Sequence, residues 1–239
     1  MVSYHFFTRH GGVSSGTHAS LNVSHGTGDD PQNIEENRAR IRRRVGTERL
    51  ISAHQVHSSQ VYVDVGEIMR PHEVEEYDAL ISNKPGTALM IQQADCQAVL
   101  LFDPVNNAIA AIHNGWRGSV GNIIAATIEQ MHRHIGTDPV QLQARISPSL
   151  GPCCAEFVNY KKELPEAFLG FQVKDNHFDF WQISAAQLIG AGVPSGSISL
   201  PEVCTSCSPD YFSYRRAVRE GDPVCGRHAS VIVLDEDSQ

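Results

Sequence analysis

Short apolar runs separated by turn-forming residues dominate the pattern along this chain, and they predict a protein rich in β-strands. Most of these runs are too short for an ordinary helix, and many contain β-branched or aromatic residues. The predicted strands are 59–65, 78–82, 87–91, 98–102, 108–112, a segment near 197–200, and 229–234.

Two neighbouring runs are joined by a connection with strong turn chemistry. Residues 98–102 and 108–112 are apolar, and Asp103-Pro104-Val105-Asn106-Asn107 lies between them. Asp, Pro and Asn favour tight turns, so the pattern predicts an antiparallel hairpin.

Helical periodicity predicts three helices. One begins at Asp29-Asp30-Pro31, an acidic cap followed by proline, and carries Ile34, Ile41 and Val45 on one face. A second has Ser119 as its N-cap and ends at Gly136. Its apolar stripe is Val120, Ile123, Ile124, Ile128, Met131 and Ile135. The third lies around 183–191, whereas residues 4–30 are predicted to be irregular loop.

The first helix also carries a run of arginines, for which we considered two interpretations. They could form an anion-binding patch or a solvated helix face that follows Glu35 and Glu36, and we favour the solvated face because most such runs are of that kind. The arginines are Arg38, Arg40, Arg42, Arg43 and Arg44.

The predicted strands and helices interleave without regular βαβ spacing, which indicates an α+β or mixed α/β fold with mixed sheets and flanking helices. No internal repeat, low-complexity segment or linker divides the chain. We therefore expect residues 1–239 to form one domain, a size at which a single core is common.

Composition and charge exclude several classes of protein. Apolar residues make up 41% of the 239 residues and charged residues 19%, which is typical of globular chains. The net charge of −8 argues against nucleic acid as the main partner. No apolar run is long enough to span a membrane, and the first residues lack a signal-peptide pattern. We therefore expect a cytoplasmic protein that binds neither nucleic acid nor membranes.

Three segments place reactive side chains next to predicted strands. They are His54-Gln55-Val56-His57, Gln93-Ala94-Asp95-Cys96-Gln97 and His113-Asn114-Gly115-Trp116-Arg117-Gly118. Cys96 precedes one strand of the hairpin and His113 ends the other, so antiparallel pairing brings the two to the same end of the ladder.

A cysteine beside a histidine allows three interpretations. Both can bind a metal, since thiolate and imidazole are zinc ligands, and His57 is then the natural third ligand of a site with an open position. Alternatively, Cys96 is a nucleophile activated by His113. The third interpretation is a buried structural cysteine beside an unrelated histidine, and spacing alone does not separate the three.

Two further motifs each allow more than one interpretation. The Gly115–Gly118 loop at the start of a helix could bind an anion with the help of Arg117, or its glycines could only permit a tight turn. Cys204-Thr205-Ser206-Cys207 has CxxC spacing and could pair with Cys153-Cys154 or Cys225, but its spacing matches no zinc ribbon. We favour inert thiols there over a redox dithiol or a zinc site.

Taken together, the motifs are recognisable along nearly the whole chain. The sequence resembles the YfiH/laccase-domain family, often labelled polyphenol oxidase or multicopper oxidase. The resemblance is carried by Thr8-Arg9-His10-Gly11-Gly12-Val13-Ser14, Ser20-Leu21-Asn22, Asp29-Asp30-Pro31, Glu36-Asn37-Arg38, Gln55-Val56-His57, Asp78-Ala79-Leu80, Ala94-Asp95-Cys96, His113–Gly118, Gly151-Pro152-Cys153-Cys154, Phe212-Ser213-Tyr214-Arg215-Arg216 and Gly226-Arg227. It implies a fold similar to the cysteine-hydrolase-type catalytic domain of cytotoxic necrotizing factor deamidases.

The resemblance also implies a zinc-dependent purine nucleoside phosphorylase. It implies that His57, Cys96 and His113 hold one zinc and carry catalysis. Adenosine, inosine and methylthioadenosine would be substrates together with phosphate, with adenosine deamination as a side activity. We expect phosphate to bind through arginines in irregular or glycine-flanked segments, namely Arg9, Arg117, Arg215 and Arg227. Asp95 or Glu156 is the candidate for moving a proton.

Two rival functions follow from the same residues. A Cys–His hydrolase or amidase acting on cell-wall precursors would use Cys96 as its nucleophile. A copper polyphenol oxidase would need the repeated HxH motifs of multicopper laccases, and this chain has one such motif, at 132–134. We therefore disfavour copper as the cofactor.

Overall fold

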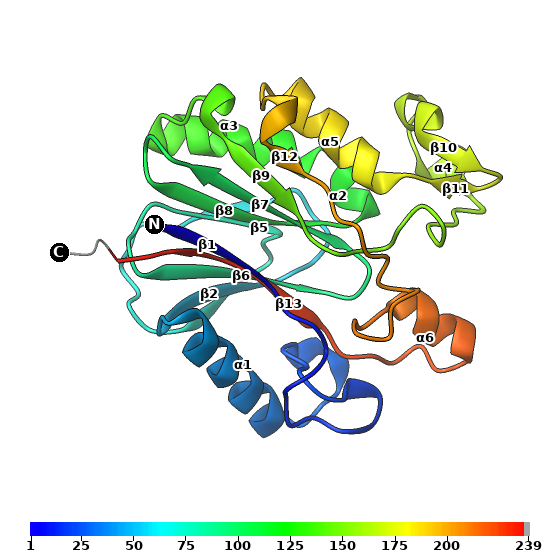
Figure 1. Ribbon diagram of the computed structural model, residues 1–239, viewed down its shortest axis with the longest axis horizontal. Coiled ribbons are helices and arrows are strands. Elements are labelled where there is room, and N and C mark those ends of the chain that lie inside the picture. Colours follow the sequence, from blue (N-terminus) through cyan, green and yellow to red (C-terminus); the bar gives the residue numbers. More distant parts are fainter. Residues whose placement is uncertain (237–239) are drawn as a thin grey trace.

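Two mixed β-sheets pack face to face in the computed structural model, which describes residues 1–236 (Figure 1). The five-stranded sheet has the order β1-β13-β6-β2-β4, in which β2 runs parallel to both of its neighbours and the other pairs are antiparallel. Its strands are β1 (Val2–Phe6), β13 (His228–Leu234), β6 (Thr87–Gln93), β2 (Arg49–His54) and β4 (His72–Glu75).

The six-stranded sheet has the order β12-β9-β7-β8-β5-β3. Its centre is antiparallel, while β12 and β3 pair in parallel at the two edges. Its strands are β12 (Ile198–Ser199), β9 (Gln143–Ile146), β7 (Gln97–Asp103), β8 (Ala108–Asn114), β5 (Ala79–Ser82) and β3 (Val61–Val63). A separate hairpin pairs β10 (Gln172–Lys174) with β11 (His177–Phe178).

Helices cover the outer faces of both sheets, so the molecule has four layers (Figure 1). The helix α1 (Pro31–Val45) packs on the five-stranded sheet, and α3 (Ile123–Ile135) and α5 (Phe180–Gly190) pack on the six-stranded sheet. The short helices α2 (Trp116–Val120), α4 (Tyr160–Glu163) and α6 (Tyr214–Glu220) complete the set. With the β10–β11 hairpin, α4 and α6 gather at the end of the sandwich opposite the start of β1 and the end of β13 (Figure 1).

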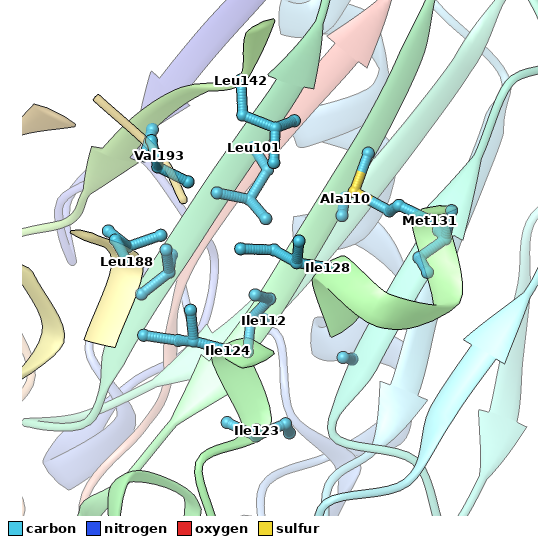
Figure 2. Close-up of a cluster of buried hydrophobic side chains, with 14 of the residues drawn as sticks. Leu101, Ala110, Ile112, Ile123, Ile124, Ile128, Met131, Leu142, Leu188 and Val193 are labelled. Carbon is cyan, nitrogen blue, oxygen red and sulfur yellow. The ribbon is translucent and has the colours of Figure 1, made fainter. Parts of the chain in front are cut away.

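Alternating side chains of the central strands divide between two cores. Leu100 and Ala111 face the other sheet and pack against its apolar residues, including Ile91. Leu101 and Ile112 face the helices, where Ile128 of α3 and Leu188 of α5 close over them (Figure 2). Because strands β5, β7 and β8 bury both faces, they have continuous apolar runs in the sequence.

The observed elements confirm most of the predicted ones, with three corrections. The long predicted helix is divided: α2 ends before Gly121, and Asn122, with φ of +50°, caps α3 in place of Ser119. Residues 4–6, which the sequence analysis included in the irregular loop 4–30, belong to β1 and pair with β13. Arg38 is buried, not solvated, and its guanidinium binds Glu73 at 2.6 Å and the Val23 carbonyl at 2.8 Å.

The other arginines of α1 lie on its more exposed side. Arg40 and Arg43 bind Glu36, and Arg42 binds Glu48. This is the solvated face that the sequence predicts for that part of the helix. Within residues 1–236, no helix has both the length and the apolar character needed to cross a membrane.

Candidate active site

Three loops or strand ends bring His57, Cys96 and His113 together. His57 follows β2, Cys96 lies between β6 and β7, and His113 is near the end of β8. One ligand atom from each lies within 4.8 Å of the other two. The Cys96 Sγ lies 3.9 Å from His57 Nε2, and the two imidazole rings meet edge to face at 4.8 Å between centroids. We call these three residues the His–Cys–His cluster.

The predicted hairpin is the reason that Cys96 meets His113. Strands β7 and β8 are antiparallel, with Ala98 opposite His113 and Gln97 opposite Asn114. Cys96 therefore lies just beyond the last pair of the ladder, at the same end as His113. The spacing argument from the sequence is correct on this point.

Asp78 is the residue that holds the two histidines in place, and sequence reasoning assigned it no role. Its Oδ1 lies 2.8 Å from Nδ1 of His113, and its carboxylate accepts from the backbone N–H groups of His57 and Ser58 at 2.9 and 2.6 Å. These bonds hold His57 at a φ of +60°, a left-handed conformation that most side chains avoid. With Nδ1 of His113 bound to Asp78, its Nε2 remains for a metal ion or a thiol.

Asp95 fixes the loop that carries Cys96. Its φ is +90°, and its carboxylate accepts from Thr205 Oγ1 at 2.7 Å and from the backbone N–H of Arg215 at 2.6 Å. Both oxygens of this carboxylate are therefore engaged in holding the loop. This arrangement favours a positioning role for Asp95 over the proton transfer considered from the sequence.

The charges of the cluster shift the pKa values of its members. Burial raises the pKa of the Cys96 thiol, but the charge and hydrogen bond of His113, aided by His57, outweigh burial and lower it to about 6. Burial lowers the pKa of His113, but Cys96 and Asp78 outweigh it and raise it to about 9. Burial raises the pKa of Asp78, but its bonds to His113 and Ser58 lower it to about 2. All three groups are therefore charged near neutral pH without a metal.

The cluster fits a metal ion in its donors and in its free space. Two imidazole nitrogens and one thiolate are donors that zinc prefers. Gly115 faces the cluster, and a Cβ there would lie 3.0 Å from Cys96 Sγ and 3.1 Å from His57 Cδ2. A side chain at this position would crowd the donors, so glycine keeps the space beside them open.

Two cavities meet at the cluster, and His57 and Cys96 line both. The aromatic cavity has a volume of 510 Å³, and Trp116, Phe157 and Phe180 are among its walls. The polar cavity has a volume of 690 Å³. Its other walls include Ser24, His25, Thr27, His54, Gln55, Glu73, Glu75, Gln92, His113 and Arg227.

The four arginines that we predicted to bind phosphate lie in different parts of the structure. Arg215 lines the aromatic cavity and Arg227 lines the polar one. Arg9 donates to the Ala19 carbonyl at 2.7 Å and lies over the Phe212 ring, outside both cavities. Arg117 is exposed, and its guanidinium stacks on Trp116 at 4.4 Å. Arg117 lies within α2, a helix of only five residues whose N-cap is Gly115.

The fold and the cluster define a YfiH-like α/β protein in which three clustered side chains could hold a metal ion. A crystal structure of protein YfiH from Bacillus licheniformis has a TM-score of 0.88 and 25% identity, over 98% of this chain and 93% of that one. The structure of YlmD from Geobacillus stearothermophilus gives 0.87 and 27%, over 98% and 92%.

Sequence comparison agrees with the structural comparison. The family described as multi-copper polyphenol oxidoreductase laccase matches residues 3–235, so the chain belongs to this laccase-domain family, which includes the YfiH proteins. A relative from Bacteroides thetaiotaomicron, named purine nucleoside phosphorylase, is 33% identical over 90% of this chain and 86% of its own length. A relative of the same name from Deinococcus radiodurans is 36% identical over 90% and 84%.

Proposed function

We propose that this chain is a zinc-dependent purine nucleoside phosphorylase that acts on adenosine, inosine and methylthioadenosine, with adenosine deamination as a side activity. The names of its relatives support the reaction. The observation that carries the proposal is the position of the His–Cys–His cluster, at the junction of an aromatic and a polar cavity. A nucleoside and a phosphate can therefore approach the same point from two sides.

The aromatic cavity suits a purine. Trp116, Phe157 and Phe180 offer flat apolar faces, and Glu156 lines the same cavity. Glu156 is our candidate for the group that exchanges a proton with the base as it leaves.

The polar cavity suits the phosphate. Arg227 brings a positive charge to it, beside the turn that contains His25 and Thr27. A phosphate oxygen forms a bond to C1′ of the ribose, the bond from C1′ to the base nitrogen breaks, and its electron pair leaves with the base. Zinc held by the cluster supplies a Lewis acid that stabilises negative charge on a reacting group.

Product chromatography of zinc-loaded protein with adenosine tests the proposal. We expect adenine and ribose 1-phosphate only when phosphate is present. Inosine formed without phosphate would demonstrate the deaminase activity alone. If adenosine, inosine and methylthioadenosine all fail to release their free purine base and the corresponding sugar 1-phosphate in the presence of phosphate, the phosphorylase proposal is rejected.

A Cys–His hydrolase is the second candidate, and one observation favours it. Cys96, His113 and Asp78 form the nucleophile, base and orienting carboxylate of a cysteine hydrolase, with Asp78 2.8 Å from His113 Nδ1. This function predicts activity on an amide substrate that survives strong chelation and is lost when Cys96 is alkylated. The phosphorylase predicts the opposite response to chelation.

The copper oxidase suggested by the family description receives no support from the ligand sets. In the described part of the chain, metal-ligating side chains gather in two clusters, the His–Cys–His cluster and a group of four cysteines. The histidines of the HxH motif, His132 and His134, are exposed on α3. The residues described therefore do not provide sites for several coppers.

A further inference from the structure

Four cysteines that the proposed reaction does not use lie together outside the active site. Two adjacent cysteines come from the turn after β9, and two come from the CxxC segment after β12. Their Sγ atoms all lie within 4.8 Å of one another. We call Cys153, Cys154, Cys204 and Cys207 the four-cysteine cluster.

The sulfur spacing matches a shared metal ion better than a disulfide. Cys207 Sγ lies 3.7 Å from Cys153 Sγ and 3.5 Å from Cys154 Sγ. A regular tetrahedron with Zn–S bonds of about 2.3 Å has sulfur atoms about 3.8 Å apart. A disulfide requires about 2.05 Å, and the structure pairs none of these cysteines.

The backbone around the cluster is arranged for thiolates. The Gly151 N–H donates to Cys204 Sγ at 3.2 Å, and N–H donors of this kind stabilise negative sulfur. A Cβ at Gly151 would lie 2.9 Å from Cys204 Cβ and 3.1 Å from the Trp181 ring, so the close approach requires glycine. The Cys207 and Ser208 N–H groups donate to the Cys204 carbonyl, which folds the CxxC segment into a tight turn.

Positive side chains flank both turns. The Arg215 guanidinium donates to the Cys154 carbonyl at 3.0 Å, and that of Arg216 donates to the Thr205 and Ser208 carbonyls at 2.8 Å each. Four thiolates around a divalent ion leave a net charge of −2, and these arginines offset part of it.

We propose that the four-cysteine cluster is a second, structural metal site, which binds one zinc ion tetrahedrally through four thiolates. Four protein ligands leave no open position, so the site stabilises structure and does no chemistry. It joins the turn that leads to Glu156 and Phe157 with the segment that leads to Tyr214 and Arg215. Both segments line the aromatic cavity, so the metal fixes one wall of the active site.

Cobalt substitution in a Cys96→Ser variant tests this site separately from the first one. The variant leaves no thiolate in the His–Cys–His cluster, so thiolate-to-cobalt charge transfer reports on the four-cysteine cluster. We expect intense charge-transfer bands at one equivalent of Co²⁺, lost on titration with Zn²⁺. X-ray absorption of the zinc form should show an all-sulfur shell at about 2.3 Å. No charge transfer, or a shell of nitrogen and oxygen, would overturn the proposal.

Metal counting with a matched cysteine variant provides a second test. Wild-type protein should hold two zinc ions per chain and Cys204→Ser/Cys207→Ser one, whereas Cys225→Ser, at a buried cysteine outside both clusters, should still hold two. If the double variant does not fold, Cys153→Ser alone should weaken zinc retention against a chelator. An unchanged zinc content in these variants, or recovery of the four cysteines as disulfides from freshly purified protein, would contradict the proposal.

Discussion

The His–Cys–His cluster and the four-cysteine cluster differ in their donors and in their surroundings. The first offers three ligand atoms held by strand ends and by a buried carboxylate, and two cavities open onto it. The second offers four thiolates from two turns, and it lines neither of these cavities. A free coordination position and access for substrate distinguish a catalytic site from a structural one. The comparison therefore supports the proposed chemistry at the first cluster and the proposed structural role of the second.

The largest expected effect is a contrast between the two clusters: a substitution in the first should remove turnover, and a substitution in the second should lower thermal stability. His57→Asn should abolish turnover, with a loss of roughly 100-fold or more, because outer partners of metal ligands alone cost roughly 10- to 100-fold. Asn tolerates the left-handed backbone at this position, so the variant should keep its melting temperature. Cys204→Ser should instead lower the melting temperature. Steady-state kinetics and calorimetry on both variants measure the contrast.

His57 is a cleaner position for this test than His113. Removing the buried His113 would leave the Asp78 carboxylate without its ion-pair partner, which destabilises by about 3–5 kcal/mol in comparable buried pairs. His134→Asn, at an exposed site on α3, is the control for the substitution itself. Equal loss of turnover in the His57 and His134 variants would reject the assignment of chemistry to the first cluster.

Gly115→Ala is the next most severe change expected at the active site. The new Cβ would lie 3.0 Å from Cys96 Sγ, so the donor would have to shift by a few tenths of an ångström. Since misplacement of a reacting group by about 1 Å costs roughly 100-fold in rate, this smaller shift should cost less than that. Gly190→Ala, with open space around its Cβ position, is the matched control and should be silent. Normal turnover in Gly115→Ala would show that the space beside the donors is not used.

Asp78→Asn should have an intermediate effect that is confined to the first cluster. The amide cannot accept from His113 and from the backbone of residues 57–58 as the carboxylate does, so zinc affinity should fall roughly 10- to 100-fold. Zinc at the four-cysteine cluster should be retained. Competition with a chelator measures both affinities on one sample.

Asp64→Asn is a matched control for Asp78→Asn. Asp64 is also a buried carboxylate, but it binds Arg49 at 2.7 Å and lines neither cavity. Its substitution should lower stability and leave zinc affinity at both clusters unchanged. Weaker zinc binding in this variant would mean that general loosening of the fold, and not Asp78 itself, controls the site.

The sequence predicted the contact between Cys96 and His113 because local rules determine it. The Asp103–Asn107 turn sets the register of a hairpin, and the register sets which residues meet at its end. The same locality explains why α1, the strands β5 to β8 and the Gly136 stop of α3 were found from periodicity and caps. Strand β2, whose backbone pairs in parallel with distant β4 and β6, has no such local signature and was missed.

The role of Asp78 and the four-cysteine cluster could not be found in the same way. Asp78 reaches His113 because β5 pairs with β8, a contact between strands that are not consecutive along the chain. One signal was available: an acidic residue directly before a fully apolar strand is out of place unless it is paired. The sequence offered the pairing of Cys204 and Cys207 with Cys153-Cys154 only as one alternative, because these cysteines come together through the packing of two irregular segments, for which no periodicity exists.

The smallest expected difference between the clusters is the pH dependence of cysteine alkylation in chelator-treated protein. In the first cluster, His113 lowers the pKa of Cys96 to about 6, so its thiolate persists at neutral pH. In the second, burial and the neighbouring thiols Cys204 and Cys207 raise the pKa of Cys153. The rate of Cys96 alkylation should therefore rise through pH 6 and level off, while that of Cys153 keeps rising above pH 9. Mass spectrometry of peptides labelled across this range gives both profiles.

The midpoint of the pH profile, and not the rate at pH 7, is the informative quantity. A thiol of pKa about 6 has roughly 30 times more thiolate at pH 7 than an ordinary thiol of pKa about 8.5. Its nucleophilicity falls with its pKa, however, so the net gain in rate is only about 2- to 3-fold. In Asp78→Asn protein, His113 loses the carboxylate that stabilises its positive charge. It should then lower the pKa of Cys96 less, so the midpoint of the Cys96 alkylation profile should move to higher pH. A midpoint near 8.5 in the alkylation profile of wild-type Cys96 would show that His113 does not stabilise the Cys96 thiolate.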